Sequence, residues 1–314
     1  MNYLKDYREG EKFVGTYLCK QKQILKTKAG KTYYSLTLQD KTGTADGKIW
    51  ELNNGIANFE PMDYIHCEGM VTSFQGNLQM NISRVRISDE GEYDPADYVP
   101  CTNKDVGEMF SRILKYVASV QNKYLRKILE IYFVENKEFV DAFKKHSAAK
   151  SVHHGFMGGL LEHTLSVTDM CQYFAEHYPM IHRDLLITAA LFHDMGKIQE
   201  ISDFPMNDYT DDGQLLGHIY IGARCMENAA AQIPNFPPKL KNELVHCILA
   251  HHGKMEFGSP KVPAIMEAMA LHMADNADAK LQTLTEVFTQ AGDNMGWLGF
   301  NRMFESNLRK TSEE

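Results

Sequence analysis

The periodicity of the apolar residues changes once along this chain, and that change limits the folds that it can adopt. Up to about residue 90, short β-rich runs alternate with turn residues, at 13–25, 32–39, 44–50, 64–74 and 78–88. From about Val106 onward, apolar residues recur every three or four positions, which is typical of helices that bury one face. A chain of 314 residues exceeds the usual size of one hydrophobic core, so we expect a multidomain protein.

The change of periodicity predicts a small all-β domain over residues 1–90 and an all-α domain over residues 106–314. The segment between them, 91–105, is acidic and proline-marked, and we interpret it as a linker. Five strands with a short helical insert near 51–59, between the third and fourth strands, is the order of an OB-fold barrel, a fold that commonly binds oligonucleotides. Helical runs are predicted at 109–120, 124–134, 160–178, 183–197, 239–252 and 263–288.

The composition, 44% hydrophobic and 24% charged, is that of an ordinary globular protein and not of a disordered or fibrous one. The N-terminus is charged from Lys5 onward, which excludes a signal peptide, and no apolar run approaches membrane-spanning length. We therefore expect a cytoplasmic protein without a membrane partner.

The charge is unevenly distributed along the chain. The formal net charge is −8, yet eight lysines stand against two aspartates within residues 12–48, which favours contact with a polyanion. A solvated lysine face is the plain alternative, but neighbouring aromatic side chains could stack on unpaired bases. Since Tyr33 and Tyr34 are adjacent in a strand, one of them must point into the barrel. The candidate nucleic-acid-binding residues are Lys20, Lys22, Lys31, Tyr33, Tyr34, Trp50 and Phe74.

Histidines and aspartates recur, most of them on the predicted helices, in a pattern that favours a catalytic metal site. The residues concerned are His163, His193, Asp194, His218, His251, His252 and Asp275. A single histidine is more often a packing residue, and we interpret His177, His182, His246 and His272 in that way. A bare carboxylate such as Asp194, among the apolar neighbours of LFHDMGK, would be costly to bury without a cation or hydrogen bonds. Imidazole and carboxylate together suit manganese, iron or cobalt better than magnesium.

The order of these motifs resembles a known family. GLLEHT, LFHDMGK, AHHG and an aspartate-bearing helix follow one another as in the HD-domain metal-dependent phosphohydrolases. With an OB-fold in front, nearly the whole chain resembles the YhaM-type 3′→5′ exoribonucleases. The second domain is then expected to be an HD-domain helical bundle.

The resemblance implies two divalent metal ions, with manganese favoured over iron or cobalt. One ion would be held by His163, His193, Asp194 and Asp275. Asp194 would bridge to the second ion, completed by His218 and by His251 or His252. Asp275 is preferred over its neighbour Asp278 because it matches the family's A-D element. Two such ions could hold a bridging hydroxide and neutralise charge on the phosphate.

Lys197 and His154 are expected to act beside Asp194 in catalysis. Lys197 lies one helical turn from Asp194, so it is placed to contact the scissile phosphate. The resemblance implies that His153 and His154 border the substrate cleft.

The sequence therefore predicts a metal-dependent 3′→5′ exoribonuclease that hydrolyses single-stranded RNA to nucleoside 5′-monophosphates, with single-stranded DNA as a further candidate substrate. Two alternatives stay open, a phosphohydrolase of nucleotides or cyclic dinucleotides and a non-catalytic RNA-binding protein. The run HHGKMEFGSP lacks the HHExxDGxGYP pattern of the cyclic-dinucleotide enzymes, and the full set of candidate ligands argues against a lost activity. Assembly into a homo-oligomer is also left open.

Overall fold

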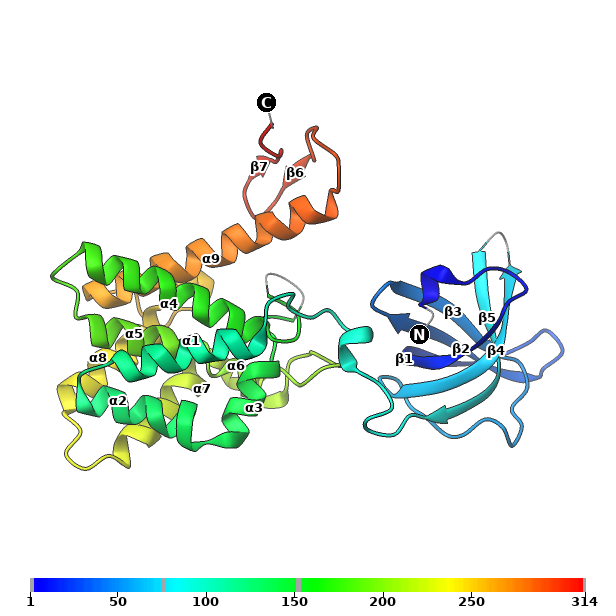
Figure 1. The fold of residues 1–314 in the computed structure, drawn as a ribbon, viewed down its shortest axis with the longest axis horizontal. Helices are drawn as coiled ribbons and strands as arrows, with labels where there is room; N and C mark the ends of the chain where they lie inside the picture. The colour runs from blue at the N-terminus through cyan, green and yellow to red at the C-terminus, as the bar shows by residue number, and fades with distance from the viewer. Residues whose placement is uncertain (1–2, 75–76, 151–153, 313–314) are drawn as a thin grey trace. The chain divides into compact units, whose positions relative to one another are not determined.

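A computed structural model describes residues 3–74, 77–150 and 154–312 (Figure 1). His153, one of the residues expected at the cleft, lies outside these ranges. The chain divides into two compact units. The first comprises Met1–Cys101 with Phe204–Met206, and the second comprises Thr102–Asp203 with Asn207–Glu314.

The first unit is a closed five-stranded barrel. Its strands are β1 (Lys12–Lys26), β2 (Thr32–Asp40), β3 (Gly43–Ile49), β4 (Tyr64–Phe74) and β5 (Asn77–Ile87). They pair in the order β1-β2-β3-β5-β4, and β1 also pairs with β4. The β3–β5 pair is parallel and the others are antiparallel. This is the strand order of an OB-fold, so the expected fold of this domain is confirmed.

A long first strand closes the barrel. β1 pairs with β4 through Lys12–Leu18 and with β2 through Leu18–Lys26, and its register shifts between Cys19 and Gln21. Such an irregularity bends a strand and increases its twist, which lets one strand serve two neighbours. The alternate side chains turned inward, among them Phe13, Tyr17, Leu36, Leu38 and Ile65, form the buried core.

The helical insert expected between the third and fourth strands is absent from residues 50–63 of the structure. Asn53 instead caps a turn by accepting a hydrogen bond from the amide of Gly55 at 2.8 Å. Ile56 then forms a parallel bridge with Val85, and Phe59 is only 1% exposed within the barrel core. The bridge at Ile56 and the burial of Phe59 hold this segment against the barrel in an extended form.

Much of the segment interpreted as a linker is packed onto one unit or the other. The side chain of Tyr98 is buried beside Tyr64, with ring centroids 5.3 Å apart, and Asp97 pairs with Lys41 at 2.7 Å. Further on, Asp105 accepts a hydrogen bond from the amide of Glu108 and caps the first long helix.

The second unit is a helical bundle. Its helices are α1 (Val106–Ser119), α2 (Lys123–Glu130), α3 (Lys137–Lys145), α4 (Gly159–His177), α5 (Arg183–Phe192), α6 (Lys197–Glu200), α7 (Asp211–Ala231), α8 (Pro238–Ala250) and α9 (Met266–Gln290). A π-helical turn, η3 (Ile131–Glu135), follows α2. After α9, the two-residue strands β6 (Phe300–Asn301) and β7 (Ser306–Asn307) pair with each other, a short exception to the all-α expectation (Figure 1).

One apolar core runs through the bundle. Helix α5 is buried along its length from Leu185 to Phe192 and packs against α4, α8 and α9. Because these helices enclose α5, the residues directly after it lie in the interior of the bundle. Among the helices that the structure describes, none combines the length and apolar character needed to cross a membrane.

Candidate metal centre

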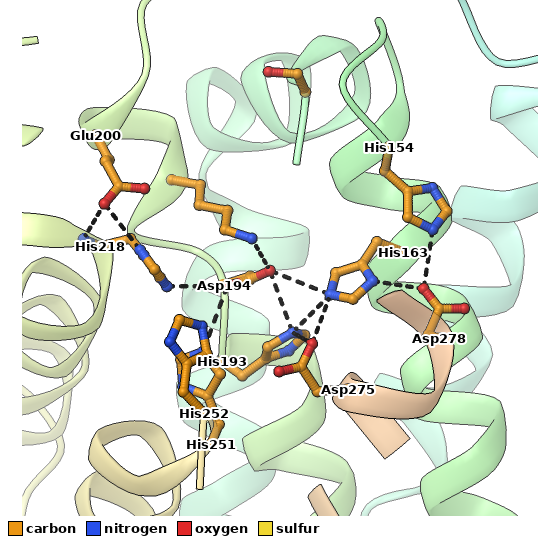
Figure 2. Close-up of polar contacts among 12 residues, drawn as sticks. His154, His163, His193, Asp194, Glu200, His218, His251, His252, Asp275 and Asp278 are labelled. Carbon is orange, nitrogen blue, oxygen red and sulfur yellow. Dashed lines mark hydrogen bonds and ion pairs between the residues drawn. The ribbon is translucent and has the colours of Figure 1, made fainter. Parts of the chain in front are cut away.

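Side chains from five places in the helical unit converge on one centre (Figure 2). His163 comes from α4, His218 from α7 and Asp275 from α9. The pair His193–Asp194 directly follows α5, and the pair His251–His252 directly follows α8. All seven residues that the sequence analysis selected as candidate ligands therefore lie together.

Two glycines let α7 bring His218 to this centre. A Cβ atom at Gly196 would lie 2.1 Å from the carbonyl oxygen of His218, so only glycine allows this approach. Gly217 has φ 73° and ψ 153°, a conformation that favours glycine, and it interrupts α7. The interruption frees the backbone amide of His218, which donates to Oε1 of Glu200 at 2.9 Å.

The two carboxylate oxygens of Asp194 face different groups of side chains. Oδ2 lies 3.3 Å from Nε2 of His163 and 3.4 Å from Nε2 of His193. Oδ1 lies 3.5 Å from Nε2 of His218 and 3.7 Å from Nε2 of His251. Asp194 thus stands between two sets of donors.

These two sets have the spacing of metal sites. In the first, the donor atoms of His163, His193 and Asp275 all lie within 4.8 Å of one another. In the second, the donor atoms of His218, His251 and His252 do so as well. Both histidines of the pair therefore belong to the second set.

Three buried atoms at the centre have no hydrogen-bond partner among the residues that the structure describes. They are Oδ1 of Asp194, Nε2 of His218 and Nε2 of His251. Buried polar atoms are nearly always paired, and an unpaired one is costly. A cation between them would satisfy all three, so the donor set fits a transition metal ion.

Every histidine of the centre holds its Nδ1 against a fixed oxygen. Three of these oxygens are backbone carbonyls, at 2.7–2.8 Å, and belong to Ala190, Ile248 and Phe257. The other two are carboxylate oxygens, of Asp278 and Glu200. Because these oxygens accept hydrogen bonds, Nδ1 carries the proton and the lone pair of Nε2 is left for a metal.

The pKa values of three groups at the centre suit cation binding. Burial opposes ionisation of Asp194, but the positive charge of Lys197 and the neighbouring histidines outweigh it and hold the pKa of that carboxyl well below its usual range. Burial of Asp275 is likewise outweighed by its contact with His163, which lowers the pKa of Asp275. For His251, burial and the neighbouring His252 push the pKa well down, so its ring is neutral at pH 7.

A pocket of about 500 Å³ opens beside the centre. His163, Lys197, His218, His252 and Asp275 line it from the centre. Its remaining wall includes side chains that the sequence analysis did not select, namely Lys150, Tyr209, Phe257, His272 and Asn276. A substrate phosphate could therefore approach both donor sets from this side.

Lys197 lies where the spacing predicted, within reach of both Asp194 and the pocket. Its Nζ is 2.6 Å from Oδ2 of Asp194. Burial lowers the pKa of the ammonium group, but Asp194 outweighs that effect and raises it, so Lys197 stays charged.

His154 is not at the pocket, where the sequence analysis expected it. Its side chain is 2% exposed, and Nε2 lies 2.9 Å from Oδ2 of Asp278, behind His163 (Figure 2). Asp278, the rival of Asp275, lies on the Nδ1 side of His163 and so faces away from the donor set.

Sequence reasoning missed Glu200. It lies three residues after Lys197 in the run HDMGKIQE, and this spacing of about one helical turn from Lys197 was the signal that could have marked it. Its contact with His218 depends on the interruption of α7, which the sequence pattern did not indicate.

Tyr33 and Trp50 form a stacked aromatic pair on the outer face of the barrel. The rings of Tyr33 and Trp50 lie 4.6 Å apart at 28°, and Nε1 of Trp50 donates to Asn81 at 3.0 Å. Tyr34 instead packs against the barrel core, edge-on to Phe59. Of the two adjacent tyrosines, Tyr33 is therefore the outward one.

The other barrel candidates are dispersed. The Nζ of Lys22 lies over the rings of Tyr34 and Phe59, at 4.8 and 4.4 Å from the centroids. Lys31 forms an exposed ion pair with Glu51 at 3.2 Å. Lys20 and Phe74 are exposed to solvent.

Comparison with known proteins finds similarity over most of the chain. Residues 160–280 match the HD domain family. A 3'-5' exoribonuclease YhaM of Geobacillus sp. (strain WCH70) is 32% identical over 257 residues, which cover 81% of this chain and 78% of that relative. The protein of the same name from Bacillus subtilis (strain 168) is 32% identical over 262 residues, 81% of each chain.

A relative from Listeria innocua serovar 6a, also named 3'-5' exoribonuclease YhaM, is 32% identical over 293 residues, which cover 90% of each chain. Among solved structures, the second OB-fold domain of replication protein A from Methanococcus maripaludis covers 29% of this chain and 98% of that domain, with 20% identity and a TM-score of 0.24.

Proposed function

Because this chain belongs to the YhaM family of 3'-5' exoribonucleases, we propose that it hydrolyses single-stranded RNA from the 3′ end to nucleoside 5′-monophosphates with two divalent metal ions. The observation that carries the two-metal assignment is the carboxylate of Asp194, whose oxygens face two separate donor sets. We place this activity in the cytoplasm.

Each of the two proposed metal ions would be held by its own set of residues. His163, His193 and Asp275 would complete one site, and His218, His251 and His252 the other, with Asp194 shared. Two ions at such a site supply Lewis acidity and lower the pKa of a bound water. The imidazole-rich ligand set favours manganese, with iron or cobalt as alternatives.

The protein's own groups would orient the substrate. Lys197 presents a charged ammonium group at the pocket, where it can contact a phosphate oxygen. The carbonyl and carboxylate contacts at Nδ1 hold the histidines in place and keep the donor atoms directed inward. The chain therefore supplies a fixed frame, which limits the reorganisation that the reaction requires.

The barrel would hold the strand. The stacked pair Tyr33–Trp50 offers an aromatic face to unpaired bases, and the lysines of β1 together with Lys31 offer charge to the backbone. Stacking of this kind does not read the 2′-hydroxyl group, so we expect single-stranded DNA to bind as well.

The test is incubation of the full-length protein with Mn²⁺ and a single-stranded RNA labelled at its 5′ end. A ladder that shortens from the 3′ end, with release of nucleoside 5′-monophosphates, would support the proposal. Intact RNA beside hydrolysed mononucleotides or cyclic dinucleotides would favour the small-molecule phosphohydrolase instead. Bound but uncleaved RNA, and no hydrolysis of any of these substrates, would indicate a non-catalytic RNA-binding protein.

A further inference from the structure

Two of the histidines at the centre differ from the others in what holds them. His193, His251 and His252 donate from Nδ1 to backbone carbonyls. His163 and His218 instead face a carboxylate, and they belong to different donor sets. Each proposed metal site therefore contains one histidine that is backed by a negative charge.

Asp278 is built into α9 to serve His163. Its Oδ2 lies 2.6 Å from Nδ1 of His163 and 2.9 Å from Nε2 of His154, and the hydroxyl of Ser166 donates to Oδ1. Asp275, one turn earlier on α9, lies 3.2 Å from Nε2 of the same His163 ring. One helix therefore contacts both nitrogens of His163, with Asp275 on the metal side and Asp278 behind.

Both oxygens of Asp278 serve as hydrogen-bond acceptors. Oδ2 faces His154 and His163, and Oδ1 accepts from the hydroxyl of Ser166. A carboxylate that accepts in this way places the proton of His163 on Nδ1.

Glu200 does the same for His218 at the other site. Its Oε1 accepts from both Nδ1 and the backbone amide of His218, each at 2.9 Å (Figure 2). The second bond exists because Gly217 interrupts the helix at that point. Ring and backbone of His218 are thus fixed by one carboxylate oxygen.

We propose that Asp278 and Glu200 are positioning residues, one for each metal site, which fix the tautomer and orientation of His163 and His218. This inference rests on the metal centre proposed above. A carboxylate that accepts the Nδ1 proton also makes the imidazole a stronger donor at Nε2, and loss of such a partner typically costs about 10–100-fold in metal affinity. His154 and Ser166 act through Asp278 and do not touch the metal.

The test is metal binding by the full-length chain without RNA. Chelator-treated protein is titrated with Mn²⁺ against a chelating indicator, for the wild type, Asp278→Asn and Glu200→Gln. An asparagine can turn its amide group toward His163 and favour the tautomer that carries its proton on Nε2. We expect Asp278→Asn and Glu200→Gln each to weaken one site by about 10–100-fold, and the double variant to weaken both.

Variants that lack one of the two histidines show which metal site has lost affinity. The effect of Asp278→Asn should vanish in a His163→Ala background, and the effect of Glu200→Gln in a His218→Ala background, because each carboxylate acts through its histidine. Glu267→Gln is the matched control for Asp278→Asn. Glu267 lies on the same helix, is 8% exposed like Asp278, and accepts a hydrogen bond from the amide of His182 at 2.6 Å.

Several outcomes would overturn the inference. Wild-type affinity at both sites in folded Asp278→Asn and Glu200→Gln would do so, as would an equal loss in Glu267→Gln. If Asp278→Asn does not fold, Ser166→Ala removes one donor to Asp278 and should weaken the same site to a smaller extent, and unchanged affinity there would count against it. Wild-type protein that binds two ions yet leaves RNA intact would refute the exonuclease and leave this inference standing.

Discussion

At the scale of single residues, the carboxylate of Asp194 forms an ion pair with Lys197 and also faces two sets of histidines. A neutral side chain of the same shape could accept hydrogen bonds but could not balance two cations. The ammonium group of Lys197 and the proposed metal ions therefore interact with the same carboxylate. Two predictions concern the ligands themselves.

The first prediction is that Asp194→Asn abolishes both metal binding and hydrolysis. Loss of an outer partner costs about 10–100-fold in metal affinity, so loss of the shared ligand should cost at least about 100-fold. The measurements are metal content and initial rate on 5′-labelled RNA. Lys197→Met is the control, because it breaks the same 2.6 Å ion pair yet leaves the carboxylate and should retain the metal. Wild-type turnover with full metal content in Asp194→Asn would refute the assignment.

The second prediction is that Mn²⁺ or Co²⁺ restores a chelator-treated enzyme better than Mg²⁺ does at equal concentration. Five of the seven candidate ligands are imidazoles, and magnesium prefers oxygen ligands and water. The measurement is the initial rate against metal concentration. Better rescue by Mg²⁺ would mean that the histidines do not bind the catalytic ions.

At the scale of elements, the interruption of α7 at Gly217 is what turns His218 toward Asp194. A regular helix would commit the amide of His218 to its own backbone and withdraw it from Glu200. The site therefore depends on a backbone conformation as well as on the ligands.

The third prediction is that Gly217→Ala weakens the site that contains His218. A residue with a Cβ in this conformation costs about 1–3 kcal/mol, and relaxation of the strain should move His218 and weaken metal binding there by about 10-fold. Mn²⁺ titration measures the loss. Gly91→Ala is the control, since Gly91 also has positive φ, 96°, but open space around it and no place in the site. Equal metal affinity in both variants would contradict the role of the interruption.

The fourth prediction concerns the outer face of the barrel. Trp50→Ala should weaken binding of single-stranded RNA by about 1–3 kcal/mol, or about 5–150-fold, because one stacking platform is lost. Binding to a fluorescent oligonucleotide in the presence of chelator measures this without cleavage. Trp297→Ala removes the chain's other tryptophan, which is 68% exposed in the helical unit, and should leave affinity unchanged. A larger effect in Trp297→Ala would move the binding surface away from the barrel.

Elements with a strong period could be predicted from the sequence, and those fixed by distant contacts could not. The five strands and the helices that carry His163 and Asp275 follow their patterns closely. Helix α7 contains glycines and has little periodicity, and α3 is only nine residues long, so neither helix was expected. The prediction of a helical insert was wrong because Phe59 is buried in the barrel core, and the local sequence pattern does not encode that contact.

The same holds within the site. The ligand candidates were found because metal ligands follow a motif order along the chain. The contacts of His154 and Glu200 join positions that the motifs do not link, so their places behind His163 and His218 required the fold. Tyr33 and Tyr34 could be predicted in part. Strand alternation required one of them to point inward, and the structure identifies that residue as Tyr34.

At the scale of the whole molecule, the proposed functions fall in different units. The candidate ligands all lie from His163 onward, whereas the stacked aromatic pair and the lysines lie before residue 90. Thr102 belongs to the helical unit, where its amide donates to the carbonyl of Met157 at 2.9 Å. A separation of strand binding from hydrolysis can therefore be tested by truncation at this point.

The fifth prediction is that a chain beginning at Thr102 still hydrolyses a very short oligonucleotide but loses most of its activity on long RNA. Phosphate contacts weaken as salt rises, so the advantage of the full-length protein on long RNA should shrink with salt. Initial rates at subsaturating RNA measure this, with circular dichroism to establish that the shorter chain is folded. Equal rates on long RNA at low salt would assign the barrel a regulatory or assembly role.

The peptide continues directly from Cys101 of the barrel unit to Thr102 of the helical unit, and this covalent continuity has a kinetic consequence. A strand held by the barrel would stay attached after its terminal nucleotide departs, so the new end would return to the same enzyme instead of diffusing away. Covalent linkage of two sites corresponds to an effective concentration on the order of 1 mM, far above that of RNA ends in dilute solution. Successive cleavages would then be processive, and the two units supplied as separate chains should release their substrate after each cut.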